Sequence, residues 1–528
     1  MIRSTLIALL LMAPVLASAQ QLPRAEDFLG RKSGLTLHDA VYLALQSNLS
    51  LRVARTRPAI AEEVVQEAKG AFDPTLSAEY GFEHRETPVA TALQGDAGLI
   101  EADQWDYKGG IFGILPFGLS YSSNLNQTRL DSDSRIVSLE PEWRSNWWNE
   151  IRLPIMKDLI YNEANVAVMR TRIARNISDE EFRRELLDLV AEVENAYWAL
   201  TAERARQRVE HKSVETARDL LEQTRVRYDV GVVSKVLVVQ AEAGVAEREV
   251  AEIRANNRAE TAQDELLNLT LAPTAEGFAS TEMVPEEPTY IEYSVNLDVA
   301  LEKAMELRPE LGSARGQVED AEVQLAQAEN QRLPTVDLVG SYSMNGLAGS
   351  AKDASDILPG ATPPNDQGGS RDTFSDYFRG DGAKGWAAGG VVEIPFPNTT
   401  ARATVRKRQI EVRRARTELR RTEQQITLGV RKAVRLLLSA IDAVEAAERR
   451  RIAQEETLRA EQEKLRLGDS TPHDVLQFEE DLVEAEREKI LALQAYLVAI
   501  TGVERSQGTL LEARGISVAN EMRRGMDR

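Results

Sequence analysis

The hydrophobic pattern changes period along this chain, and it does so twice in the same order. Apolar residues recur at helical spacing over 35–69, and alternation typical of a half-buried strand follows over 75–83. A second amphipathic helix begins at Val295 and a second alternating stretch at Thr335. Ala40 and Ala300 occupy equivalent positions at an offset of 260. The order of patterns therefore predicts two internal repeats that cover most of the chain.

Strands are predicted in a block within each repeat. In the first, further alternation lies at 119–125 and 149–153, and in the second at 388–394. The first repeat offers two strands, or four if an extra hairpin forms over about 109–125. The chain as a whole then offers four to six strands, with long surface loops over about 88–103 and 346–385.

A long helix follows each block of strands. The two helices are predicted over about 162–229 and 401–467, and at 1.5 Å per residue each would be on the order of 100 Å long. In the first, Leu189, Val193 and Leu200 step by four and seven, with equivalents at an offset of 237. This spacing predicts coiled-coil packing along a narrow apolar seam.

Each long helix breaks at one glycine and then resumes. Gly231 and Gly468 can supply the left-handed backbone that ends a helix. Ser234 or Ser470 can then cap the next helix, which returns to about residue 271 or 500. Two helical hairpins with tight tips are expected.

The ends of the chain have a different composition from its repeats. The first residues have one basic residue, an apolar core and a small-x-small site, which is typical of a secretory signal. The tail has no apolar pattern and is expected to be loosely ordered. The predicted division is a signal peptide over 1–19, a first repeat over 20–272 with its strands over about 75–153, a linker over 273–296, a second repeat over 297–502 with its strands over about 335–396, and a tail over 503–528.

Composition excludes several classes of function. The formal net charge of −20 argues against a nucleic acid as partner. The chain has no cysteine, and its four histidines lack the spacing of metal ligands, so no metal site is expected. There is no phosphate-binding glycine loop and no catalytic motif. We therefore expect neither an enzyme nor a cofactor.

The predicted strands are too few to close a barrel within one chain. Small closed barrels need about eight strands, and an open edge in lipid leaves backbone groups unpaired. If the strands enter a membrane, several copies must share one barrel. Trp143, Trp147 and Trp148 lie beside a strand and suit an aromatic belt at a membrane interface. The alternative is that these tryptophans are core residues of a soluble sheet.

The order of these elements resembles the TolC-like outer-membrane efflux proteins. The resemblance extends over about 35–502 and includes the opening helices, the proline before each first strand, and the tip motifs. It also includes the segments 153–155 and 394–396, in which proline stands between apolar residues at the end of each strand block.

The resemblance implies an α+β membrane protein that works as a homotrimer. Three copies would share one twelve-stranded transmembrane β-barrel in the lipid of the outer membrane. Their antiparallel helices would form a coiled-coil barrel, a periplasmic tunnel that tapers at the tips. Such a protein is a passive efflux or secretion conduit, opened by a periplasmic adaptor and an inner-membrane transporter.

The resemblance also implies roles for residues around the tips. In this family, acidic residues just after the second tip glycine narrow the tunnel, and the matching positions here are Asp474 and Gln477. The positions of the family's closing salt bridge are Leu237 and Ser470, so a different lock is expected. Asp474 can equally be a carboxylate favoured by a helix N-terminus. The residues implied to contact the adaptor are Val230, Gly231, Val232, Leu467, Gly468 and Asp469.

A second hypothesis is a periplasmic coiled-coil scaffold or adaptor that forms no pore. Adaptors commonly have one helical hairpin and separate β-domains. Two hairpins interleaved with strands disfavour that interpretation.

Overall fold

The computed structural model describes residues 35–88, 98–134, 137–270, 283–352, 368–373, 383–467 and 469–526. The predicted signal peptide and Gly468 lie outside these residues, as does most of both predicted loops. The chain divides into two compact units, which are described separately. One comprises 54–184, 308–426 and 519–528, and the other 1–53, 185–307 and 427–518.

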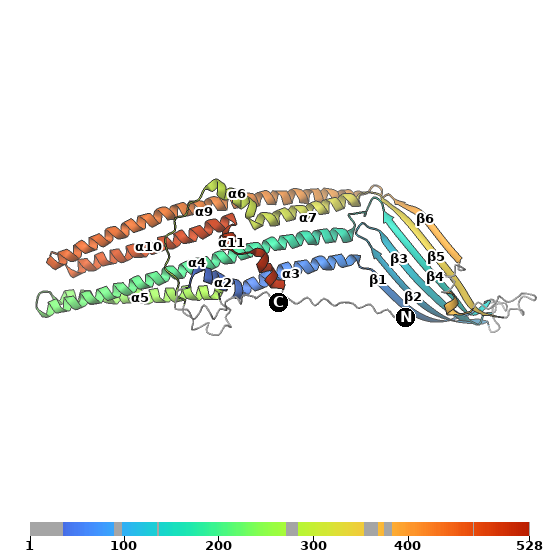
Figure 1. Cartoon of the computed structure of the whole chain (residues 1–528), viewed down its shortest axis with the longest axis horizontal. Helices are drawn as coiled ribbons and strands as arrows, with labels where there is room; N and C mark the ends of the chain where they lie inside the picture. The colour runs from blue at the N-terminus through green and yellow to red at the C-terminus, as the bar shows by residue number, and fades with distance from the viewer. Residues whose placement is uncertain are drawn as a thin grey trace, which may run out of the picture. The chain divides into compact units, whose positions relative to one another are not determined.

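The first of these, the sheet unit, contains one antiparallel sheet of six strands in sequence order (Figure 1). The strands are β1 (Thr75–Pro88), β2 (Leu99–Ile114), β3 (Ser120–Ser132), β4 (Leu139–Pro154), β5 (Thr335–Ala351) and β6 (Ala383–Glu393). The highest strand count expected from the sequence is confirmed. The strands are longer than predicted, and β2 and β5 extend into the stretches expected to be loops.

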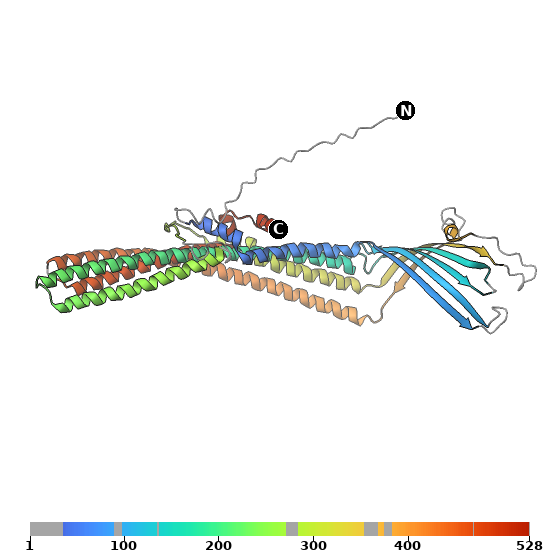
Figure 2. The same ribbon diagram turned by 90° about the horizontal axis from the view of Figure 1, so that it is seen from below.

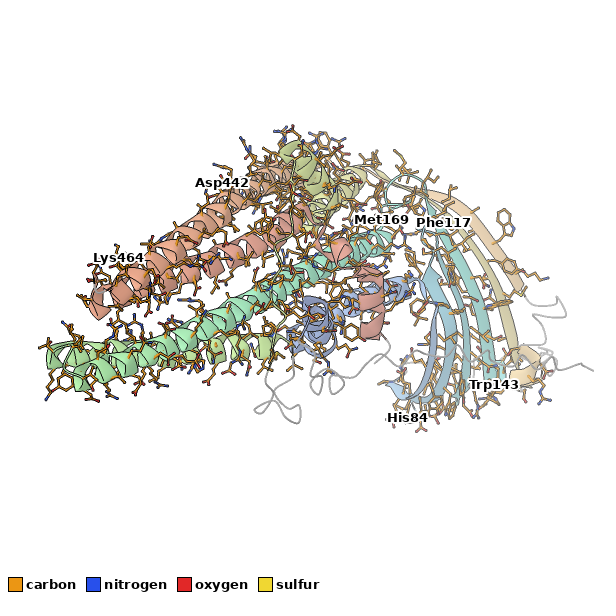
Figure 3. The ribbon with its side chains drawn as sticks, turned by 60° about the vertical axis from the view of Figure 1, so that its left-hand side comes forward. His84, Phe117, Trp143, Met169, Asp442 and Lys464 are labelled. Carbon is orange, nitrogen blue, oxygen red and sulfur yellow. The ribbon has the colours of Figure 1, made fainter. Side chains whose placement is uncertain are left out.

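The extra hairpin of the first repeat is β2 and β3. Its turn lies where predicted, because the Gly118 amide donates to the Leu115 carbonyl at 2.8 Å and Gly118 has φ of +88°. Figure 3 shows Phe117 in this turn at one end of the sheet, with His84 and Trp143 toward the other. The hairpin pairs with β1 on one side and β4 on the other, so it is part of the sheet.

Successive side chains alternate between the two faces of this sheet. The register collects apolar side chains on one face, here called the apolar face: Leu76, Tyr80, Phe82, Trp105, Tyr107, Ile111, Trp147, Ile151, Leu338, Tyr342, Trp386 and Val392. The opposite, polar face has most of the charges: Glu79, Asp106, Lys108, Arg144, Glu150, Arg152 and Asp337.

The second, or hairpin, unit contains the tip-side parts of two helical hairpins, from residue 185 of α4 and from residue 427 of α9. The first consists of α4 (Glu163–Asp229) and α5 (Lys235–Thr270), and the second of α9 (Thr399–Leu467) and α10 (Pro472–Gln507). The helix bounds match the predicted ones closely at both tips. Both tips lie at the same end of this unit (Figures 1 and 2). No described helix has both the length and the apolar character needed to cross a membrane.

The shorter helices complete the two units. They are α2 (Leu37–Ser47), α3 (Leu49–Lys69), the 3-10 turn η1 (Gly70–Phe72), α6 (Leu297–Leu307), α7 (Pro309–Gln331), α11 (Leu510–Ala513) and α12 (Val518–Met526). The helix predicted over 35–69 is thus broken at Asn48, whose side-chain oxygen accepts from the Leu51 amide at 2.9 Å.

The described part of the linker is held by two buried tyrosines. The Tyr197 hydroxyl donates to the Leu35 carbonyl at 2.8 Å and accepts from the Glu286 amide at 3.3 Å. The Tyr496 hydroxyl donates to the Ile291 carbonyl and accepts from the Tyr293 amide. Burial raises the pKa of Tyr197 to about 12, which keeps its hydroxyl a donor.

The expectation of a loosely ordered tail is wrong over its described residues. α10 continues to Gln507, and Gly508, with φ of +78°, ends it. Leu510 and Leu511 are buried. The part of the tail up to residue 518 is therefore anchored in the hairpin unit, because these two side chains give it an apolar contact that its average composition does not reveal.

Candidate functional site

The first tip ends α4 with a Schellman motif. The Gly231 amide donates to the Tyr228 carbonyl at 2.8 Å, and the Val232 amide donates to the Arg227 carbonyl at 2.9 Å. Gly231 has φ of +76°, a backbone conformation in which a side chain is strained. The predicted glycine cap is confirmed, and Ser234 directly precedes α5.

The first tip exposes apolar side chains. Val230 and Val232 are 69% and 72% exposed, and Val236 on the first turn of α5 is exposed as well. Exposed apolar side chains are stabilised when another surface removes them from water. The adjacent exposed valines at the end of this hairpin are therefore suited to contact another protein. This geometry is compatible with the implied adaptor contact, which stays a prediction.

The second tip lies between α9 and α10, and the structure describes the residues on either side of Gly468. The Asp469 amide donates to the Lys464 carbonyl at 2.9 Å, and Leu467 is 67% exposed. Lys464 is near the end of α9 in Figure 3. Gly468 itself lies outside the described residues, so its implied adaptor contact remains a prediction.

The cap of α10 is Thr471 and not Ser470. The Thr471 hydroxyl accepts from the Asp474 amide at 3.3 Å, and the Asp474 carboxylate accepts from the Thr471 amide at 3.1 Å and from its hydroxyl at 2.7 Å. These hydrogen bonds form a capping box and lower the pKa of Asp474. Asp474 thus has a structural role within one chain, and its carboxylate stays ionised at neutral pH.

Two of the other residues implied near the constriction lie on α10 and α5, and Ser470 directly precedes the cap of α10. Gln477 is exposed on α10, one turn past Asp474, and Leu237 is half-buried on the first turn of α5. The implied positions Leu237 and Ser470 form no salt bridge, since neither side chain is charged.

A different polar link joins α5 to α10 behind the tips. The buried Arg248 guanidinium donates to the Leu476 carbonyl at 3.0 Å and to the Ser213 hydroxyl at 3.2 Å. Leu476 packs in the apolar cluster of the first hairpin with Leu221 and Val245. Sequence reasoning missed Arg248, because nothing in the spacing marks a buried arginine on a helix rich in charge.

Farther from the tip, a buried ion pair joins α4 to α10. Arg487 donates to both carboxylate oxygens of Glu210, at 2.7 and 2.9 Å, and Glu210 is buried. The hydrogen bond to Glu210 raises the pKa of Arg487. Each chain therefore holds its two hairpins together by directional bonds as well as by apolar packing.

The aromatic cluster divides between the two faces of the sheet. Trp143 lies beside Arg129, whose guanidinium is 5.9 Å from its ring centroid and 4.3 Å from that of Trp105. Trp143 and Trp147 both lie on the apolar face. Trp148 instead lies on the polar face, where it pairs with Asn124 and Ser343. A one-sided belt can therefore include Trp143 and Trp147 but not Trp148. Strand parity, which the sequence already displays, could have excluded Trp148.

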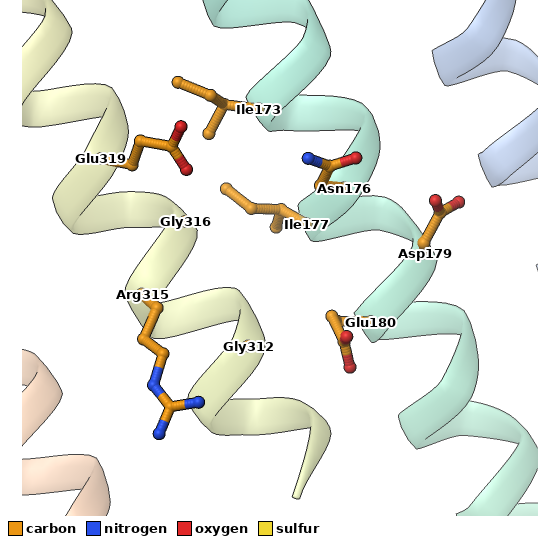
Figure 4. A pocket seen from close by; sticks show the side chains of 9 residues that line it. All are labelled: Ile173, Asn176, Ile177, Asp179, Glu180, Gly312, Arg315, Gly316 and Glu319. Atoms are coloured by element: carbon orange, nitrogen blue, oxygen red, sulfur yellow. The ribbon is translucent and has the colours of Figure 1, made fainter. Parts of the chain in front are cut away.

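The sheet unit also has a hollow between α4 and α7, with a volume of about 440 Å³ (Figure 4). Two glycines of α7, Gly312 and Gly316, let α4 approach closely, because an added Cβ would lie 2.7 Å from Glu180 or Ile177. Burial raises the pKa of Glu180. Within the described ranges, no group of three or more metal-ligating side chains is present.

The match to a known protein family has two parts, which correspond to the two repeats. The chain matches the family described as outer membrane efflux protein over residues 40–270 and 300–509. No curated protein matches it.

Solved structures with this fold include three bacterial channels or outer membrane proteins. The CmeC outer membrane channel of Campylobacter jejuni is 14% identical, with a TM-score of 0.63, and 93% of this chain and 89% of that one are covered. The outer membrane protein VceC of Vibrio cholerae is 17% identical, with a TM-score of 0.60 and coverage of 89% and 96%. The MtrE outer membrane channel of Neisseria gonorrhoeae, in its open state, is 16% identical, with a TM-score of 0.60 and coverage of 90% and 89%.

Proposed function

The chain belongs to the outer membrane efflux protein family, and we propose that three copies of it form one passive conduit from the periplasm to the outside. The family is one of channels and not of enzymes, so the chain is an outer-membrane efflux channel with a periplasmic helical part. The homotrimer, the shared barrel and the partners at the tips belong to the proposal. So does removal of the predicted signal peptide over 1–19.

The observation that carries the proposal is an open sheet with one apolar face. In the part of the chain that the structure describes, β1 and β6 end the strand order, and six strands are fewer than a closed barrel needs. On the apolar face, Leu76 and Trp386 are 79% and 80% exposed. A monomer in water would leave this surface uncovered, whereas lipid and neighbouring copies can cover it.

The helices support contact between copies as well. Exposed apolar side chains recur along one side of α5, at spacings of three and eleven residues, and they are Val236, Val239, Val250 and Ile253. Eleven residues are close to three helical turns, so the four lie on one side of the helix. A neighbouring copy that covers this row would continue the coiled-coil wall of a tunnel.

We propose that the tips receive a periplasmic adaptor linked to an inner-membrane transporter. The exposed valines of the first tip and Leu467 of the second supply the apolar contacts, with Gly231 and Asp469 in the two turns, and the implied contact of Gly468 belongs to the same proposal. Because the chain has no energy-coupling motif of its own, opening must be driven by those partners.

Conductance across a planar lipid bilayer tests the proposed function. The purified protein is expected to form discrete channels, while a scaffold without a pore would give none. The scaffold hypothesis is disfavoured by the length and apolar character of the sheet. A protein recovered only in the aqueous fraction of cells, with no conductance, would favour it instead.

At the constriction, Asp474→Asn is expected to weaken the preference for cations. Three copies of Asp474 around one axis would form a ring of negative charge, which repels anions. Asparagine retains an oxygen that can accept within the cap but removes the charge. Ion selectivity of single channels, measured from reversal potentials in a salt gradient, checks this.

Thr471→Ala is the matched control for the constriction. It removes the capping hydroxyl and leaves the Asp474 charge in place, so cation selectivity should stay near that of the unchanged protein. Equal selectivity in Asp474→Asn and the unchanged protein would remove Asp474 from the constriction. Gln477, one turn farther along α10, would then be the next residue to substitute.

For the aromatic belt, we expect lipid to reach Trp143 and Trp147 but not Trp148. Variants that keep only one of these three tryptophans, with the other tryptophans of the chain changed to phenylalanine, can be placed in vesicles of brominated lipid. Bromine quenches indole fluorescence at short range, so quenching should be strong for the first two. Equal quenching of all three would contradict the assignment of the apolar face to lipid.

A further inference from the structure

We propose that each copy contributes six strands, so that the shared outer-membrane β-barrel has eighteen strands and not the twelve implied by the family resemblance. This inference rests on the proposed trimer. Its decisive element is the β2–β3 hairpin, which adds two strands to each copy. The partner at both edges of the sheet is a second copy of this chain.

The β2–β3 hairpin is an integral part of the six-stranded sheet. β1 pairs with β2 along its whole length, from Thr75 opposite Phe112 to Pro88 opposite Leu99. β3 pairs in the same continuous way with β4. β1 and β4 therefore do not neighbour each other, and a four-stranded copy cannot be obtained by leaving the hairpin aside without re-pairing both strands.

The hairpin also continues both faces of the wall. Trp105 and Tyr107 extend the apolar face beside Phe82 and Tyr80, with ring centroids 5.2 and 5.4 Å apart. On the polar face, the Lys108 ammonium lies 3.0 Å from the Glu79 carboxylate. In a hairpin that stood above the membrane, water would surround both faces, and no lipid contact would require apolar side chains in register with those of the neighbouring strands.

The direction of the strands permits closure by identical copies. All five neighbouring pairs are antiparallel, so β1 and β6 run in opposite directions. The free edge of β1 can therefore pair antiparallel with the free edge of β6 of the next copy. Three such junctions close a ring, and the total, three times six, is an even number as antiparallel barrels require.

The strand count sets the width of the wall. With strands about 4.8 Å apart and tilted by about 40°, the radius is roughly 12 Å for twelve strands and roughly 18 Å for eighteen. Equivalent backbone positions in three copies would then lie roughly 21 or 31 Å apart. Barrels of sixteen to eighteen strands leave an open aqueous lumen.

Spin labels measure this distance directly in the intact assembly. The chain contains no cysteine, so Ala388→Cys gives one labelling site per copy, on the apolar face of β6. Pulsed electron resonance of the labelled protein in lipid should give the distance for eighteen strands, increased by the outward reach of the label. A distance about 10 Å shorter, as for twelve strands, would overturn the proposal.

Deletion of residues 99–132 is the matched control. It removes β2 and β3, leaves β1 and β4 antiparallel, and should shorten the distance by about 10 Å in a copy of four strands. An unchanged distance in this variant would contradict the inclusion of the hairpin in the wall. If the intact protein gives no distance between copies at all, the trimer itself is wrong, and the proposed function fails with it.

A disulfide test does not depend on the folding of the deletion variant. Glu79→Cys with Lys108→Cys places two thiols on paired positions of β1 and β2. Oxidation should join them within one chain, whereas pairing of β1 with β4 would separate them. Absence of this disulfide in a protein that still conducts would overturn the inference while leaving the channel intact.

Discussion

Arg514→Leu is expected to lower the free energy of unfolding by about 3–5 kcal/mol, because it leaves buried charge without a partner. Arg514 donates to both carboxylate oxygens of Glu194, at 2.5 and 3.0 Å, and lies 3.0 Å from the Glu504 carboxylate. Glu194 is 0% exposed, and Thr501 donates to the same carboxylate. The thermal unfolding midpoint of the purified protein, at fixed concentration, measures the loss.

The pH dependence identifies the cause of that loss. Burial already raises the pKa of Glu504, and Arg514 opposes the rise. Without the arginine, the folded-state pKa of Glu504 should rise further above its unfolded value, so the folded form binds a proton more tightly. The deficit should therefore shrink as the pH falls toward about 5 and grow at neutral pH.

Arg505→Leu is the matched control for this cluster. Arg505 lies on α10 beside Glu504, and its half-exposed guanidinium donates to Asp188, itself half-exposed, at 2.9 Å. Exposed ion pairs contribute about 0–1 kcal/mol, so this variant should unfold close to the unchanged protein. Equal loss in the two variants would mean that burial of Glu194 does not determine the stability.

The second large effect is expected at the first tip. Changing both Val230 and Val232 to aspartate should abolish export in cells while the assembly still forms. Both side chains are exposed, so the substitution costs little within one copy, but it puts charge where the proposed adaptor needs an apolar surface. Export of a fluorescent efflux substrate and the amount of assembly in the membrane are the two readouts.

Changing the same two residues to isoleucine controls for the site. Isoleucine keeps the β-branched shape and the apolar surface, so export should be retained. Loss of assembly in the aspartate variant would mean that these valines pack between copies. Full export by that variant would exclude the tip as the adaptor contact.

Secondary structure was largely predictable from the sequence because each element has a strong local signal. The long helices carry an apolar seam over many turns, and Gly231 marks the end of α4. The hairpin about Phe117 followed from turn chemistry at Pro116 and Gly118. Strand number was less certain, because β2 contains Gly109, Gly110 and Gly113, which weaken its alternation.

Tertiary contacts of single polar residues were not predictable. Arg248 and Arg514 are two of many arginines in the sequence. Only the fold shows that Arg248 is buried against a carbonyl oxygen and that the partly buried Arg514 pairs with the buried carboxylate of Glu194. Thr471 replaced Ser470 as the cap because the position of the first helical residue shifts by one, which helix patterns rarely fix. The parity of Trp148 was readable from the sequence and was missed.

The mass of the assembly extracted from the outer membrane tests the central claim most directly. The claim is that one chain has too few strands to close a β-barrel, so identical copies must close it together. Native mass spectrometry of the protein released from detergent should give three times the mass of one mature chain. A single chain that remains folded and conducts ions on its own would contradict it.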